Sequence, residues 1–236
     1  MTPIPWRSIQ LRVTLFTLGI FVLSIWSLSF FASRLLQDDM QAIVGTQQFS
    51  TVTIMAAELN QQLQDRLKSL EDVAASISPA TLANATALQT QLEQQVVFQH
   101  LFNAGFFVTR TDGIPIADVP VAAKRLGLGV AERDYMVAAL QEGRSSVGKP
   151  VIGKSLGTPV FSMAAPIRNA YGHVIGVVVG VTNLNAPNFL DQVTGNRYGK
   201  SGDYFVASLP HRLNVTSSDK KRVMQALPPV LSLIHI

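Results

Sequence analysis

The segment Val13–Ser33 constrains the fold more than any other part of the chain. Its 21 residues carry no charge between Arg12 and Arg34, and twelve of them are Val, Leu, Ile or Phe. As a helix it would be about 31 Å long, which matches a hydrocarbon core of about 30 Å. The twelve apolar residues favour insertion by roughly 5 kcal/mol. We therefore predict a retained transmembrane helix at 13–33. The alternative, a cleaved signal peptide, has a shorter apolar core and a small-residue cleavage site.

The flanking charges predict the orientation of that helix. Arg7 and Arg12 precede it, and Arg34 is followed at once by Asp38 and Asp39. Because positive charge stays inside, residues 1–12 are predicted to form a cytoplasmic tail. Everything after Ser33 is then predicted to lie outside the cytoplasm.

Composition excludes several function classes. Without Arg7 and Arg12, the 19 basic residues become 17 against 15 acidic ones, too balanced for a nucleic-acid-binding surface. The chain has no cysteine, which rules out thiol catalysis and Cys-ligated metal sites.

A long stalk helix is predicted over 34–78. Apolar residues recur there at steps of three and four, namely Val52, Met55, Leu59, Leu63, Leu67, Leu70, Val73 and Ile77. Ser78-Pro79 ends the pattern, so a helix from Asp38 to Ile77 would be roughly 60 Å long. Its apolar stripe could pack on its own domain or on a second copy. The second possibility predicts a homodimer through this helix.

After Pro79 the pattern changes to short elements. Another helix is predicted around Leu88, Leu92 and Val96. A hairpin follows, with strands at Gly105–Thr109 and Ile114–Val119. A helix is then predicted at Glu132–Gln141, followed by strands at Val147–Lys154, Val160–Ile167 and His173–Thr182. Short links make neighbouring strands antiparallel. The fold class is therefore α+β, with one PAS-like antiparallel sheet in a membrane-distal module at 79–187.

Several motifs together resemble the double Cache (dCache) sensor family. They are Arg133-Asp134-Tyr135 before a helix, Val147-Gly148-Lys149-Pro150-Val151, Gly157-Thr158-Pro159-Val160, Ala165-Pro166-Ile167-Arg168 and Gly172-His173-Val174-Ile175-Gly176. The resemblance spans roughly 38–229. It implies a ligand-binding distal module followed by a membrane-proximal module, both on the periplasmic side of a bacterial inner membrane.

A second, incomplete PAS-like module is predicted at 188–230. It would hold a short helix at Asn188–Val193, strands at Tyr198–Val206 and Leu213–Thr216, and a helix carrying Val223, Met224 and Leu227, capped by Ser217 or Ser218. About forty residues cannot close a sheet on a core, so we expect a truncated chain. Residues 231–236 resemble translated sequencing adapter and are interpreted as an artefactual tail. The alternative is a core strand.

The output of the receptor can be inferred by resemblance alone. The stretch Asn183–Leu190, with Asn196–Tyr204 and Pro210–Leu213, looks most like sensors fused to GGDEF diguanylate cyclases. Chemotaxis receptors and histidine kinases carry the same fold and remain alternatives. The cyclase active-site string is absent, so this chain is not expected to be an enzyme.

The resemblance also suggests ligand-binding residues. Family members that bind amino acids carry Arg-x-Trp-Tyr at the middle helix and a late Asp. Here Arg133 is kept, Tyr135 replaces Trp, and no acid occurs at Gly180-Val181-Thr182. A buried α-ammonium without a partner is costly, whereas Arg can hold a carboxylate bidentately. We therefore predict a small carboxylate ligand at Arg133 and Tyr135, with Ser162 and Arg110 as weaker candidates. Alternatively, Arg133 pairs with Glu132 or Asp134 on the surface.

Other sites are not indicated. The four His residues are scattered, and neither His-Glu-x-x-His nor a phosphate-binding Gly-rich loop occurs, so we expect no metal and no cofactor. A catalytic triad is not evident either. The competing hypothesis is a membrane-tethered interaction domain with no pocket.

Overall fold

The computed structural model describes residues 9–195, 197–198 and 202–227. Most of the predicted cytoplasmic tail and the whole predicted artefactual tail at 231–236 lie outside these residues. The chain divides into two compact units, one up to Ile54 and one from Met55 onward.

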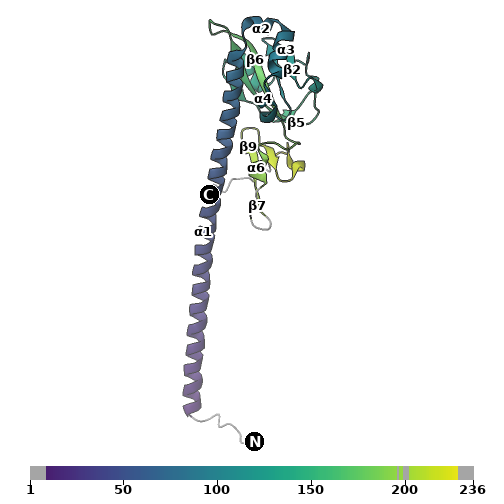
Figure 1. Ribbon diagram of the computed structural model, residues 1–236. Helices are drawn as coiled ribbons and strands as arrows, with labels where there is room; N and C mark the ends of the chain where they lie inside the picture. Colours follow the sequence, from purple (N-terminus) through teal and green to yellow (C-terminus); the bar gives the residue numbers. More distant parts are fainter. Residues whose placement is uncertain (1–8, 196, 199–201, 228–236) are drawn as a thin grey trace. The chain divides into compact units, whose positions relative to one another are not determined.

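Helix α1 spans Ile9–Ser76 without a break (Figure 1). Both the predicted membrane helix and the predicted stalk are therefore helical. Arg12–Gln37 has a mean hydropathy of 2.1, and its most apolar window is 0% buried. It is the one described helix long and apolar enough to cross a membrane. This confirms a candidate span in the first unit.

The C-terminal part of α1 packs on the second unit's own core. Leu70, Val73 and Ile77 are buried there, and Leu59, Leu63 and Leu67 pack against the same cluster. Val52, four turns before Leu67, is 46% exposed. The predicted stripe thus covers its own domain from Leu59 onward.

The second unit is built on a six-stranded sheet with the order β2-β1-β6-β5-β3, in which β4 also pairs with β5. Every pair is antiparallel, as predicted. The strands are β1 (Phe106–Arg110), β2 (Pro115–Val119), β3 (Ser146–Val147), β4 (Val151–Ile152), β5 (Pro159–Arg168) and β6 (Val174–Asn183). The predicted α+β, PAS-like fold is confirmed.

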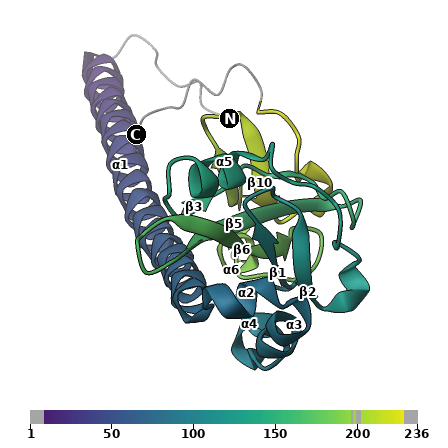
Figure 2. The ribbon, with the colours of Figure 1, turned by 90° about the horizontal axis from the view of Figure 1, so that it is seen from above.

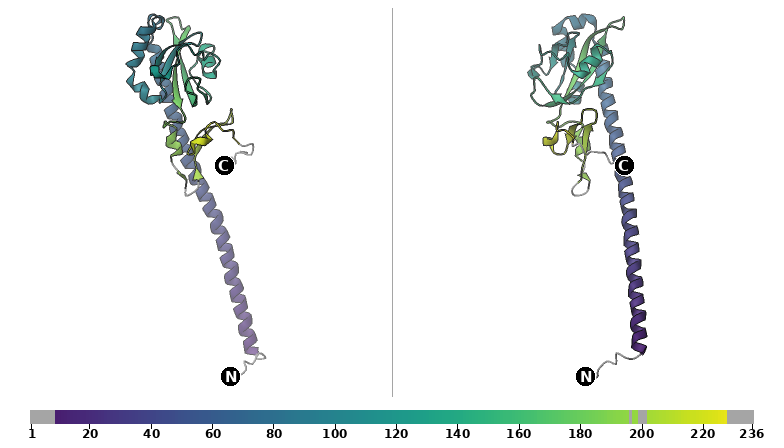
Figure 3. Two further views of the ribbon diagram at one scale, coloured as in Figure 1. Left: turned by 90° about the vertical axis from the view of Figure 1, so that its right-hand side faces the viewer. Right: turned by 180° about the vertical axis from the view of Figure 1, so that it is seen from behind.

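The two faces of the sheet carry separate cores. Phe106 and Val108 of β1 point to one core, and Phe107 points to the other, because side chains alternate along a strand. The first core is covered by the end of α1 and by α2 (Pro79–Ala83), α3 (Ala85–Glu93) and α4 (Val96–Leu101). Helix α5 (Asp134–Leu140) covers the second (Figures 2 and 3).

Two predicted elements in this unit were wrong in detail. Leu88 and Leu92 lie buried on α3, but Val96 begins a separate helix and is 59% exposed. The predicted strand Val147–Lys154 is split into β3 and β4. Between them, Lys149 donates its backbone N–H to Asp134 rather than to a strand, and Pro150 has no N–H to donate.

Over the residues that the structure describes, the predicted second module has shorter and more numerous elements than expected. It contains α6 (Asp191–Thr194), β7 (Arg197–Tyr198), β8 (Gly202–Asp203), β9 (Phe205–Ser208), β10 (Leu213–Ser217) and the 3-10 turn η2 (Lys220–Arg222). The predicted strand Tyr198–Val206 is therefore interrupted. The helix expected after Ser218 is also wrong, because Asp219 caps a single turn and Met224 adopts a φ of 67°.

Candidate functional site

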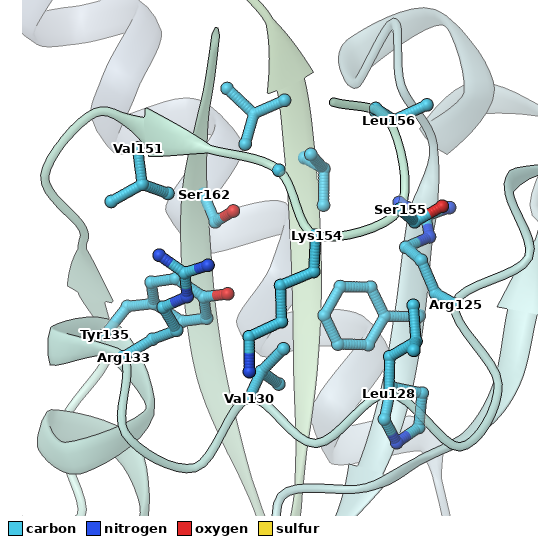
Figure 4. Close-up of a pocket in the computed structure, with 15 residues that line it drawn as sticks. Arg125, Leu128, Val130, Arg133, Tyr135, Val151, Lys154, Ser155, Leu156 and Ser162 are labelled. Carbon is cyan, nitrogen blue, oxygen red and sulfur yellow. The ribbon is translucent and has the colours of Figure 1, made fainter. Parts of the chain in front are cut away.

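A cavity of about 50 Å³ lies on the α5 side of the sheet (Figure 4). Fifteen residues line it. They come from α5, from strands β1, β2, β4, β5 and β6, from the loop that follows the 3-10 turn η1 (Val121–Ala123), and from the loop that follows β4. Eight of them are apolar and one is Gly153. The six polar ones are Arg125, Arg133, Tyr135, Lys154, Ser155 and Ser162.

Three of the four predicted ligand-binding residues meet at this cavity. Arg133 is the N-cap residue of α5, Tyr135 lies in its first turn, and Ser162 projects from β5. Figure 4 shows these three side chains grouped at one side of the opening. Arg110 is different, because it lies at the exposed end of β1 and is not among the lining residues.

Arg133 is held only loosely. Its Nη2 donates to the carbonyl of Ile152 at 3.4 Å, and its Nε lies 3.6 Å from Glu132 Oε1. The Asp134 carboxylate instead accepts the backbone N–H groups of Tyr135 and Lys149, at 2.9 and 2.8 Å. A surface pair with Glu132 therefore exists, but it is long and leaves much of the guanidinium fork for an anion.

Tyr135 supplies a neutral donor inside the cavity. Its side chain is 5% exposed, and burial raises the pKa of its phenol, opposed by a hydrogen bond with Ser162. The hydroxyl therefore stays protonated at neutral pH. Gly148 makes this position possible, because a Cβ there would come within 2.5 Å of Tyr135 Cδ1.

Arg125 is a lining residue that sequence reasoning missed. Its Nε donates to Asp118 Oδ1 at 2.7 Å, and its Nη1 and Nη2 donate to the carbonyls of Ala104 and Val119. The Asp118 carboxylate is fully buried. An acid inside the otherwise apolar strand 115–119 was the signal that could have revealed this pair.

Lys154 and Ser155 were missed as well. Lys154 Nζ donates to the carbonyl of Gly129 at 2.6 Å and pairs with Glu132 at 2.7 Å, and Ser155 Oγ donates to the carbonyl of Ala123. The hydrogen bond from Lys154 lowers the pKa of Glu132. These contacts join the loop after β4 to the loop before α5.

The cavity is suited to holding an anion. None of its fifteen described lining residues carries a carboxylate, and β6 contributes Val181, close to where the family pattern has its late Asp. Among the described residues no group of three His, Cys, Asp or Glu could hold a metal ion. The polar lining residues can donate hydrogen bonds to a bound anion.

The fold is shared with solved sensor domains. No protein-family model and no curated protein sequence matches the chain. The ligand-binding domain of the Pseudomonas aeruginosa amino-acid chemoreceptor PctC with GABA is similar with a TM-score of 0.60 and 22% identity, covering 74% of this chain and 75% of that one. PctB of the same organism with L-Gln gives 0.57 and 23%, covering 73% and 68%.

The chemoreceptor CtaA of Pseudomonas fluorescens with L-serine has a TM-score of 0.56 at 21% identity, covering 71% of this chain and 69% of that one. These proteins are ligand-binding sensor domains of receptors. At such low identity the similarity shows the architecture only. The chain therefore has the fold of the Cache-type ligand-binding domains of bacterial chemoreceptors.

Proposed function

We propose that this chain is the extracytoplasmic sensory region of a bacterial membrane receptor and that it binds a small carboxylate. The observation that carries this proposal is the meeting of Arg133, Tyr135 and Ser162 at one cavity whose lining has no acid. A guanidinium, a neutral phenol and a hydroxyl are all donors, and a carboxylate accepts from each.

The same lining disfavours an α-amino acid. The solved relatives named above are complexes with GABA, L-Gln and L-serine, so an ammonium-bearing ligand is the natural competitor. An ammonium buried in this cavity would meet Val181 and other apolar groups rather than a carboxylate. Leaving that charge without a partner costs several kcal/mol.

The test is calorimetric titration of the full chain, held in nanodiscs, with acetate, butyrate, alanine and GABA. Arg133→Ala should weaken binding of a carboxylate by several-fold to a hundredfold, about 1–3 kcal/mol, because a charge-assisted contact is lost. Arg110→Ala is the matched control, since Arg110 lies outside the cavity. Equal effects of the two variants, or binding of the amino acids alone, would overturn the proposal.

The placement in the membrane follows from the apolar helix segment Arg12–Gln37 and its flanking charges. A periplasm-specific reporter fused after Pro229 should be active in bacteria. Activity of a cytoplasm-specific reporter at the same position would refute the orientation.

For the whole receptor, two outputs compete. Resemblance in the connecting stretch favours a diguanylate cyclase, whereas the solved relatives are chemoreceptors and favour a chemotaxis output. Sequencing the gene downstream of codon 229 decides between them, since a GGDEF domain and a methyl-accepting helical domain are unmistakable.

We also propose a homodimer through α1. Phe49 and Val52 lie three residues apart on one side of the helix and are 57% and 46% exposed in the part before Met55. Because the chain has no cysteine, a single Val52→Cys substitution gives a clean cross-linking probe. Disulfide-linked dimers should form in membranes with Val52→Cys and not with Tyr171→Cys, because Tyr171 is 85% exposed on the distal module.

A further inference from the structure

We infer that the ligand is a short, unbranched aliphatic monocarboxylate, whose carboxylate lies at Arg133, Tyr135 and Ser162 and whose chain points toward Leu128 and Leu156. This inference rests on the proposed function and adds the chemical class of the rest of the ligand. It follows from where the hydrogen-bond donors of the cavity lie and from which of them already have partners in the protein.

The polar groups away from Arg133 are already engaged. Arg125 directs its guanidinium to Asp118 and to the carbonyls of Ala104 and Val119. The hydroxyl of Ser155 and the ammonium of Lys154 donate to backbone carbonyls, and Lys154 also pairs with Glu132. A second carboxylate on a ligand would therefore have to share Lys154 with Glu132, whereas an apolar chain leaves all of these contacts in place.

The remaining lining is apolar from the sheet to the opening. Phe107, Val160 and Val181 are buried at the base of the cavity, whereas Leu128 and Leu156 are 37% and 36% exposed. Figure 4 shows these two leucines on the side of the opening opposite Arg133, Tyr135 and Ser162. When an apolar group of a ligand covers partly exposed leucines, the apolar surface that it removes from water adds to the binding free energy.

The size of the cavity limits the shape of the ligand. A volume of about 50 Å³ is small, so it favours a small ligand over a bulky one. A longer acid must extend toward Leu128 and Leu156, and in a cavity of about 50 Å³ a linear chain needs less width than a branched one.

The experiment is calorimetric titration of the full chain in nanodiscs with acetate, propionate, butyrate and hexanoate. Affinity should rise with each methylene, by up to about fourfold, because each buries apolar area. Succinate and isobutyrate should bind more weakly than butyrate, since one adds a second charge and the other a branch. Butan-1-ol and empty nanodiscs control for partition into lipid.

Two leucine variants test the direction of the chain. Leu128→Ala and Leu156→Ala should each weaken hexanoate binding several-fold, and by a larger factor than acetate binding, because acetate has no chain that covers these leucines. Leu126→Ala is the matched control, because Leu126 lies in the same loop as Leu128, is 49% exposed and does not line the cavity. If a variant fails to fold, the titration of the unaltered protein with acids of increasing length still tests whether the aliphatic chain is bound.

The outcomes separate the two proposals. If no carboxylate of any length binds, the proposed function is wrong and this inference falls with it. If acetate binds in an Arg133-dependent way but affinity does not rise with chain length, or succinate binds as well as butyrate, the inference is overturned and the proposed function stands.

Discussion

The buried pair of Arg125 and Asp118 offers the sharpest test of how the cavity is held together. The Asp118 carboxylate is fully buried and accepts from Arg125 Nε at 2.7 Å and from the backbone N–H of Arg125 at 2.9 Å. Arg125 also ties the loop to the carbonyls of Ala104 and Val119, at 3.0 and 3.1 Å. The perturbation is Arg125→Met, which keeps most of the stem and removes every guanidinium donor.

The expected cost is about 3–5 kcal/mol, because the substitution leaves a buried carboxylate with one backbone donor. The two lost bonds to carbonyls, at about 1 kcal/mol each, are included in that range. Such a loss is about a fifth or more of the stability of an ordinary domain. Adding Asp118→Asn should restore at least about 1 kcal/mol, since it removes the uncompensated charge and keeps an acceptor for the Arg125 N–H.

Pulse proteolysis in a urea series measures these free energies of unfolding on the full chain in detergent. The control is Lys68→Met, which removes an exposed i,i+4 pair with Asp72 at 2.9 Å and should cause no measurable change. If the double variant is as unstable as the sum of the two single variants, the charges are not coupled and the reasoning is refuted.

Gly180→Ala should destabilise the fold by about 1–3 kcal/mol, because its Cβ would come within 2.5 Å of the Phe102 ring. Gly129→Ala has no atom within 4 Å of its Cβ and should be neutral, so equal effects in pulse proteolysis would contradict this account. Tyr135→Phe should reduce the loss of stability above a pH of about 10.0, the ordinary pKa of tyrosine. Burial raises the folded pKa, so the unfolded state ionises first as the pH rises, and stability present below that pH is lost above it. Parallel stability curves for the wild type and Tyr135→Phe from about pH 9 to about pH 11 would argue against a buried phenol.

Much of the architecture was predictable because its signals are local. The apolar run 13–33 and the three- and four-residue steps up to Ile77 both describe α1, which ends at Ser76. Thr111-Asp112-Gly113 predicted the β1–β2 hairpin, and Gly113 adopts the positive φ of 73° that such a turn requires. Alternation and short links then predicted an antiparallel sheet.

For the candidate site, the sequence suggested Arg133, Tyr135 and Ser162, and these lie together at one cavity. It also suggested Arg110, which the fold leaves at the exposed end of β1. Strand register decides this difference, because a shift of one residue changes which face a side chain occupies.

By itself, then, the sequence determined the helical span, the periodic elements and the fold class, since periodicity and turn chemistry act between neighbours along the chain. Tertiary structure alone decided the partners of the buried groups. Asp118 accepts a hydrogen bond from Arg125, seven residues away in the sequence, and Lys154 donates one to Gly129, twenty-five residues away. Asp134 interrupts a predicted strand by accepting the N–H of Lys149. Such pairings depend on desolvation and on distances that packing sets, and the spacing of residues along the chain predicts neither of them.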